Sequence, residues 1–256
     1  MVPSVVLVHG IRTSATMWRA QSEALDAAGV PHLAVDLPGH GTRLGERFTL
    51  DGALDVLDSA VDSLPGPVIL CGLSLGGYLG LHWAGSRGGD RIAGMIAAAC
   101  GTTPRGAALA GYRGIAALIA RLPDQGAGIN QFMIDRFVPE ETREDVTRGG
   151  VALDVMADGL GAMAGVRPVE SIARIRVPLL LINGRFDHFR LEERRYLAAA
   201  RARDGVPATW SELLIVPGAS HLVSLTQPEA FTRILLGVVD GLREGLPAVA
   251  AADSSW

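Results

Sequence analysis

The chain has 256 residues, of which 48% are hydrophobic and 20% charged, a composition typical of a soluble globular protein that can bury a substantial core. Its formal net charge of −4 excludes a strongly basic surface, so neither nucleic acid nor an anionic membrane is expected as a partner. All 23 basic residues are arginine, which excludes a catalytic lysine or a Schiff base.

The amino-terminal residues enter an apolar, strand-like run at once. They read M-V-P-S-V-V-L-V-H-G and lack the basic segment and the separate apolar segment of a secretory leader. No apolar run approaches the roughly 18 residues of a membrane span, so we expect a cytoplasmic protein. Cys71 and Cys100 end two apolar runs and show neither metal-ligand spacing nor a disulfide framework. Neither a metal nor a cofactor is expected.

Short runs of Val, Ile and Leu alternate along the chain with longer stretches of helical period. This alternation is typical of parallel strands covered by helices on both faces. The predicted strands are Val5 to Val8, His32 to Asp36, Val68 to Cys71, Ile92 to Ala99, Leu179 to Asn183 and Glu212 to Val216. The predicted helices are Thr16 to Ala28, Leu50 to Ser63, Leu75 to Ser86, Leu191 to Arg203 and Pro228 to Arg243. The fold class is therefore α/β, with a mostly parallel sheet.

The alternation fails between about Thr102 and Ala173, where several apparent helices follow one another. An insertion between two parallel strands lies over the carboxyl ends of the sheet, where ligands bind in open α/β folds. We therefore expect a helical cap inserted after the fourth strand, covering the site as a lid. The predicted division is an α/β core of residues 1–101 and 174–244, a lid of residues 102–173 and a mobile tail of residues 245–256.

The candidate nucleophile is Ser74, which lies in the sequence C-G-L-S-L-G-G directly after a predicted strand. Gly72 and Gly76 lack the Cβ atoms that would collide where a strand turns sharply into a helix. The pattern predicts a strained elbow that holds the serine hydroxyl clear of the backbone.

A serine hydroxyl needs a base within hydrogen-bond reach and a carboxylate that orients that base. His221 follows the last predicted strand and is the candidate base, and Asp187 lies on the loop after the strand L-L-L-I-N-G. His40 and His188 are also expected near the mouth of the site. Asp36 ends a strand too, but the P-G-H-G sequence that follows it indicates a structural turn.

Stabilising an oxyanion takes two backbone N–H groups. The residue after the nucleophile usually supplies one of them, which here is Leu75. The second is expected from the loop after the first strand, and the amide of Ile11 is our candidate.

Five sequence blocks together resemble the α/β-hydrolase fold superfamily and occur in its order. They are V-L-V-H-G, D-L-P-G-H-G, G-L-S-L-G-G, N-G-R-F-D and G-A-S-H, and they span nearly the whole chain. The resemblance is to a serine esterase or lactonase with a helical lid, and it implies Ser74 as nucleophile, His221 as base and Asp187 as acid.

Two features depart from the superfamily pattern. The family core usually begins with an additional antiparallel hairpin, whereas Met1 here stands only eight residues before His9. We therefore expect a trimmed sheet of about six strands. The acid motif commonly continues to a proline, whereas this chain reads D-H-F-R-L-E-E-R-R.

The type of residue at the nucleophile position limits which reactions are possible. Relatives that open epoxides or displace halide carry aspartate at the elbow, so Ser74 argues against both reactions. The expected function is hydrolysis of a carboxylic ester or a lactone of a small, largely apolar substrate through an acyl-enzyme. The open alternatives are a thioesterase, a biosynthetic cyclase or acyltransferase with the same triad, and a non-catalytic ligand-binding homologue.

Apolar residues recur at roughly helical spacing in the predicted lid. Those expected to bind substrate are Phe132, Met133, Met156 and Leu160. The lid also carries arginines that could bind a substrate carboxylate, although exposed arginines on helices are usually just solvated. They are Arg105, Arg113, Arg121 and Arg136.

Overall fold

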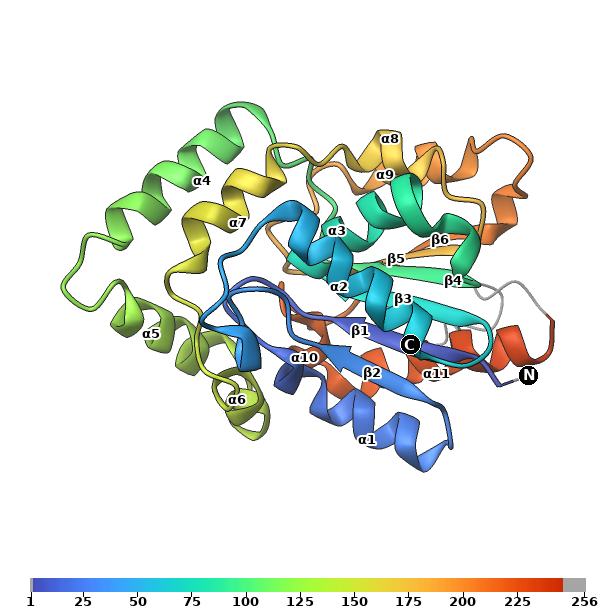
Figure 1. The fold of residues 1–256 in the computed structure, drawn as a ribbon, viewed down its shortest axis with the longest axis horizontal. Coiled ribbons are helices and arrows are strands. Elements are labelled where there is room, and N and C mark those ends of the chain that lie inside the picture. Colours follow the sequence, from blue (N-terminus) through green and yellow to red (C-terminus); the bar gives the residue numbers. More distant parts are fainter. Residues whose placement is uncertain (1, 246–256) are drawn as a thin grey trace.

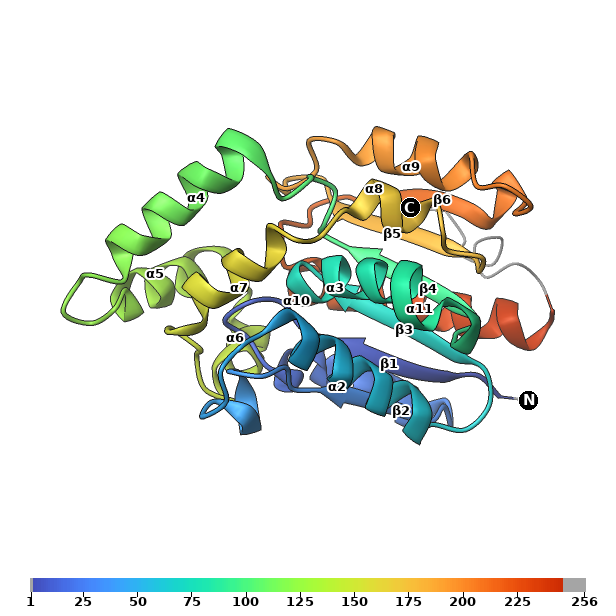
Figure 2. The same cartoon turned by 45° about the horizontal axis from the view of Figure 1, so that its top comes forward.

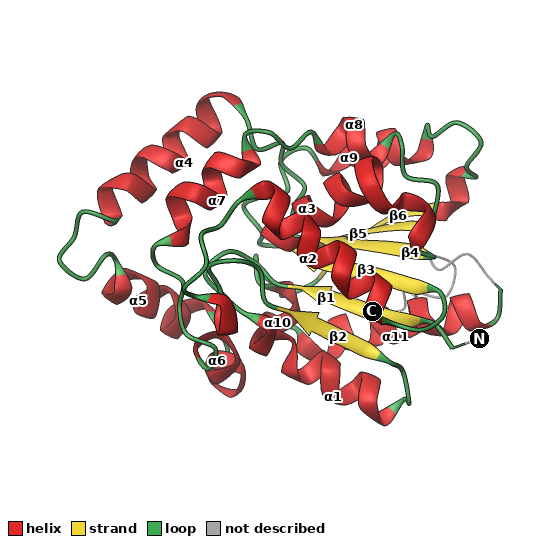
Figure 3. Ribbon diagram, viewed as in Figure 1, coloured by secondary structure: helices red, strands yellow, loops and turns green. Residues whose placement is uncertain are grey.

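Six strands form one sheet in the computed structural model, which describes residues 2–245 (Figures 1 and 3). The strands are β1 Ser4–Val8, β2 His32–Val35, β3 Val68–Leu73, β4 Gly94–Ala98, β5 Leu179–Gly184 and β6 Ser211–Val216. Their order is β2-β1-β3-β4-β5-β6, and every neighbouring pair is parallel. The predicted α/β class and the sheet of about six strands are confirmed. The expected mobile tail lies outside the described residues, except for Gly245.

Helices connect the strands and cover both faces of the sheet. They are α1 Arg19–Ala27, α2 Leu50–Ser63, α3 Leu75–Trp83, α4 Gly106–Ile119, α5 Ala127–Phe137, α6 Glu140–Thr147, α7 Val155–Met163, α8 Pro168–Ile172, α9 Glu193–Arg201, α10 Val223–Thr226 and α11 Pro228–Arg243. Within residues 2–245, no helix combines the length and the apolar character that crossing a bilayer requires.

The alternation of side chains along the strands divides the interior into two cores. In β1, Val6 and Val8 belong to the core that α2, α3 and α9 cover, and Val5 and Leu7 belong to the core under α1 and α11. Successive residues of a strand point to opposite faces, so a strand that is buried on both faces reads as one apolar run. All five residues of β1 are buried.

The turn from β3 into α3 requires two glycines. Ser74 adopts φ 53° and ψ −114°, a left-handed conformation that is strained for a residue with a side chain. A Cβ atom at Gly72 would collide with the main chain of Gly76, and one at Gly76 would collide with the main chain of Val8. Because both positions are glycine, the start of α3 can pack directly against β1 and β3, and this packing holds the strained elbow in place.

Helices α4 to α8 lie between β4 and β5 in the chain. Figures 1 and 2 show α4, α5, α6 and α7 beyond the ends of the strands, at the edge of the sheet opposite the amino terminus. We call these four, residues 106–163, the inserted helices.

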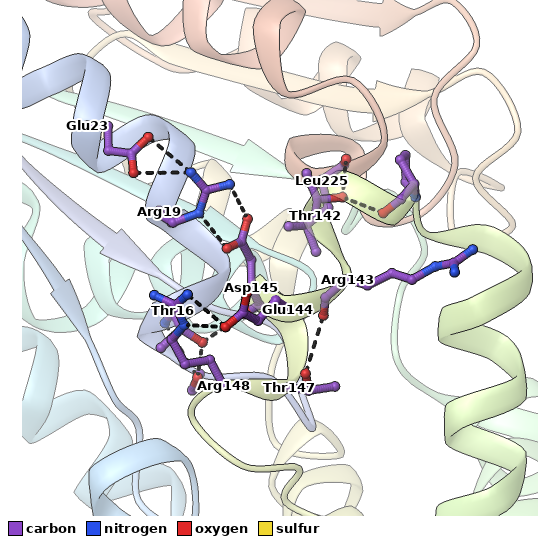
Figure 4. A network of polar contacts seen from close by, with 12 residues as sticks. Thr16, Arg19, Glu23, Thr142, Arg143, Glu144, Asp145, Thr147, Arg148 and Leu225 are labelled. Carbon is purple, nitrogen blue, oxygen red and sulfur yellow. Dashed lines mark hydrogen bonds and ion pairs between the residues drawn. The ribbon is translucent and has the colours of Figure 1, made fainter.

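An ion pair between the half-exposed Arg19 and the buried Asp145 attaches α6 to α1 (Figure 4). Arg19 donates to both carboxylate oxygens of Asp145, over 2.6 Å from Nε and 3.0 Å from Nη2. Thr16 donates to the Asp145 carbonyl over 2.7 Å, and Thr142 donates to the Leu225 carbonyl over 3.0 Å. A two-pronged guanidinium–carboxylate contact fixes orientation as well as distance. Helix α6 is therefore fixed to the core, whereas α4 and α5 extend away from it.

Candidate active site

The three side chains expected to form a triad meet at the carboxyl ends of the strands. Ser74 follows β3, Asp187 lies on the loop after β5, and His221 lies on the loop between β6 and α10. Ser74 Oγ is 3.0 Å from His221 Nε2, and His221 Nδ1 is 2.9 Å from Asp187 Oδ1. A carboxylate only accepts, so Nδ1 of the neutral ring carries the proton and Nε2 accepts from the serine hydroxyl. The arrangement can remove a proton from Ser74.

The carboxylate of Asp187 is held ionised inside the protein. Its side chain is fully buried, and Oδ1 also accepts from the Phe189 amide over 2.8 Å. Burial opposes ionisation, but the hydrogen bond and charge of His221 together with the Phe189 amide outweigh it and lower the Asp187 pKa. An ionised Asp187 can orient the imidazole and stabilise its protonated form.

The rings of His188 and Phe189 pack against His221, the candidate base. The ring centroids of His188 and Phe189 lie 5.1 Å and 4.9 Å from that of His221. Desolvation and the neighbouring His221 lower the pKa of His188, so this ring is uncharged at neutral pH. The structure places His188 on the wall of the site, as the sequence led us to expect, but gives it no hydrogen bond to Ser74.

The two amides expected to hold an oxyanion flank Ser74. Leu75 opens α3, where a helix leaves its first N–H groups without internal acceptors. Ile11 lies on the loop after β1. Within residues 2–245, neither amide donates to a protein acceptor, and both residues line the same cavity as Ser74.

Two buried histidines hold the loop that carries Ile11. His9 Nε2 accepts from the Leu37 amide over 3.0 Å, and His40 Nε2 accepts from the Arg12 amide over 3.3 Å. The Nδ1 atom of each ring lies within 3.0 Å of a carbonyl, of Gly10 and of Pro38 respectively. The contacts therefore require neutral rings protonated at Nδ1. His40 is not a second base but a support for the loop.

Acid should destabilise the protein through these rings. Burial, followed by the charge of His40, lowers the pKa of His9 to about 3, and burial lowers the pKa of His40. Between about pH 6.5 and these lowered values the unfolded state binds more protons than the folded state. The unfolding free energy should fall below pH 6.5 by about 1.4 kcal/mol per pH unit for each ring.

Urea unfolding at half-unit steps from pH 7.5 to 4.5 measures this slope. The variant His40→Gln retains a side-chain acceptor but does not titrate, so its slope should be smaller than that of the native chain. A stability that stays constant from pH 6.5 to 4.5 would mean that both rings are already protonated in the folded protein.

A cavity of about 540 Å³ opens over Ser74. Its walls come from the loops after β1, β4, β5 and β6 and from the inserted helices. Of the residues expected to bind substrate, Met133, Met156 and Leu160 line it. Phe132 lies outside the cavity and is 66% exposed. Neighbouring residues of a helix point about 100° apart, so α5 presents Met133 and not Phe132 to the cavity.

One charged residue of the cavity wall, Arg12, was not among those predicted from the sequence. The four arginines that were expected as possible carboxylate ligands are all exposed and lie outside the cavity. The sequence offers one signal for Arg12: this residue comes two positions after the H-G motif, on the loop that follows the first strand. In the described part of the chain, no group of three or more His, Cys, Asp or Glu side chains could hold a metal ion.

The sequence matches a known protein family over most of its length. A family model described as the alpha/beta hydrolase family matches residues 5–234. A pimeloyl-(acyl-carrier protein) methyl ester esterase of Vibrio campbellii is 26% identical over 244 residues, which are 90% of this chain and 91% of that protein.

Two solved structures are similar over nearly the whole chain. A thermophilic esterase from Thermogutta terrifontis, with malate bound, has a TM-score of 0.70 at 26% identity, covering 95% of this chain and 90% of that one. The enol-lactonase of Burkholderia xenovorans LB400 has a TM-score of 0.71 at 22% identity, covering 95% and 92%. The second likeness concerns the fold alone.

Proposed function

The chain belongs to the alpha/beta hydrolase family, and we propose that it is a serine hydrolase that cleaves a carboxylic ester of a small, largely apolar substrate. The observation that carries the proposal is the hydrogen-bonded series Ser74–His221–Asp187 at the floor of an apolar cavity. Hydrolysis of esters by the Vibrio and Thermogutta relatives, as their names state, supports the same reaction class.

The first half-reaction forms an acyl-enzyme. Ser74 Oγ attacks the ester carbonyl while His221 Nε2 takes its proton, and Asp187 stabilises the imidazolium without itself becoming protonated. The Ile11 and Leu75 amides donate to the oxyanion, and each such donor contributes about 10²- to 10³-fold to turnover. When the tetrahedral intermediate collapses, the C–O bond to the alcohol breaks and His221 returns the proton to the leaving oxygen.

The second half-reaction releases the acid. Water gives a proton to His221 and attacks the acyl carbonyl, the same amides hold the new oxyanion, and Ser74 leaves with the proton from His221. The triad and the two amides act in both half-reactions, and His221 alternates between base and acid.

A series of p-nitrophenyl esters with lengthening straight acyl chains tests the proposal. Each methylene buried in the apolar cavity should raise kcat/KM about fourfold, until the chain outgrows the cavity and the rate falls. Adding methanol separates hydrolysis from acyl transfer: hydrolysis yields chiefly the free acid, whereas an acyltransferase yields chiefly the methyl ester. A folded protein that releases no nitrophenol from any ester would contradict ester hydrolysis.

A further inference from the structure

We propose that Arg12 determines substrate specificity by binding a carboxylate of the substrate, so that the substrate is an ester that also carries a free acid group. This inference rests on the proposed ester hydrolysis and names its substrate class. Among residues 2–245, the Arg12 side chain lines an apolar cavity and has no hydrogen-bond or ion-pair partner.

The side chain of Arg12 is half-buried in the cavity wall. Its Nε atom is fully buried and has no hydrogen-bond partner among the described residues. The hydrogen bond from Arg12 to His40 comes from the main-chain amide and leaves the guanidinium free. A buried donor without an acceptor is costly and therefore rare in folded proteins.

The other buried or half-buried arginines of residues 2–245 all have protein acceptors. They are Arg19, Arg43, Arg91, Arg143, Arg190 and Arg203. Arg203 shows the rule most clearly, because it is 4% exposed and donates to the Ala200, Ile175 and Val177 carbonyls. Since the described residues supply acceptors for each of these six guanidinium groups, an acceptor for the Arg12 guanidinium is expected from outside the chain. It would have to bind the terminal NH₂ groups, because Nε itself has no accessible surface.

The remaining wall of the cavity offers no counter-ion. Among the described residues that line it there is no Asp or Glu, and its polar members are neutral side chains such as Tyr112 and Asn130. Burial lowers the pKa of Arg12, and Tyr112 on α4 acts against this shift, but a guanidinium stays protonated at neutral pH. The cavity therefore carries one positive charge, which suits the single negative charge of a carboxylate better than a phosphate dianion.

The position of Arg12 also fits a substrate that is bound at both of its ends. Arg12 follows Ile11, the proposed oxyanion donor, and its φ of 66° is fixed in the left-handed region by the loop that His40 holds. An ester carbonyl at Ser74 and a carboxylate at Arg12 would thus be held by neighbouring segments. A guanidinium can donate two parallel hydrogen bonds to a carboxylate, which a lysine cannot do.

Two matched series of methyl esters test this assignment at pH 7.5. One series contains monomethyl esters of straight-chain dicarboxylic acids, and the other contains methyl esters of monocarboxylic acids of the same length. For each pair, the preference is the ratio of kcat/KM for the acidic ester to kcat/KM for the neutral ester. The native protein should prefer the acidic ester at one chain length.

The variants Arg12→Met and Arg12→Gln should lower this preference about 10- to 100-fold, the effect of a hydrogen bond to a charged group. Arg12→Lys should retain part of the preference, because the positive charge remains but a lysine cannot donate two parallel hydrogen bonds to the carboxylate. The control is Arg113→Met on the exposed surface of α4, which should leave the preference unchanged.

A preference that is equal in the native protein, Arg12→Met and Arg12→Gln would overturn the role of Arg12 while leaving ester hydrolysis intact. A native protein that hydrolyses neither series and does not react with a fluorophosphonate would instead refute the proposed function, and this inference with it.

Discussion

The variant Ser74→Ala is expected to hydrolyse esters with a kcat about 10⁴- to 10⁶-fold below that of the native protein. The substitution removes the hydroxyl oxygen that we propose forms the acyl-enzyme, while the amides of Ile11 and Leu75 and the cavity remain. Activity through direct attack by water would persist at a low level. Stability should change little, because alanine and serine experience the same left-handed φ of 53° at this position.

Steady-state kinetics with the best p-nitrophenyl ester measures this effect, and thermal unfolding verifies the fold. The matched control is Ser86→Ala, which removes an exposed hydroxyl bonded to the His82 carbonyl and should leave kcat within twofold. If Ser74→Ala retained a tenth of the native kcat, another residue would have to be the nucleophile.

Asp187→Asn is expected to lower kcat about 10⁴-fold, as removal of the orienting charge does in triads of this kind. Oδ1 of Asp187 accepts both from His221 Nδ1 and from the Phe189 amide, so asparagine should keep its carbonyl oxygen at this place and its NH₂ group at the place of Oδ2. The imidazole then stays oriented, but it loses the negative charge that stabilises its protonated form in the transition state. Because the side chain is fully buried, water cannot replace that charge.

The comparison variant is Asp36→Asn, since Asp36 is the other carboxylate that follows a strand. It accepts from the Ala15 and Thr42 amides over 2.7 Å and 2.9 Å, so its loss should lower the melting temperature while kcat falls less than tenfold. The ratio of the two effects on kcat identifies the acid. Equal losses in the two variants would contradict the assignment of Asp187.

Most of the sheet could be predicted because its strands are buried on both faces and read as continuous apolar runs. Helix ends were harder to predict. The helix predicted from Thr16 begins with a 3-10 turn, Ala15–Trp18, before α1. The helix predicted to reach Ser86 instead changes to a π turn, Ala84–Gly88, after Trp83. The short helix α10, which follows His221, was not predicted, and Pro228, which lacks an N–H, starts α11 as a separate helix.

Within the site, the sequence could predict the residues whose motifs fix their backbone geometry. Ser74 depends on two glycines, and Asp187 and His221 each follow a strand of one sheet, so topology alone brings them to one edge. The cavity wall could not be predicted in this way. Helix α5 is apolar around much of its surface, and its rotation, which separates Met133 from Phe132, is set by tertiary packing. The direction of Arg12 depends on one left-handed residue and on contacts with distant segments.

The most direct test of the activated serine is intact-mass spectrometry after brief exposure to a fluorophosphonate, because it requires no knowledge of the substrate. The native protein should gain the mass of a single adduct. The adduct should be absent from Ser74→Ala and should form far more slowly on Asp187→Asn. No adduct on the folded native protein, or an adduct that persists in Ser74→Ala, would contradict Ser74 as the nucleophile of this enzyme.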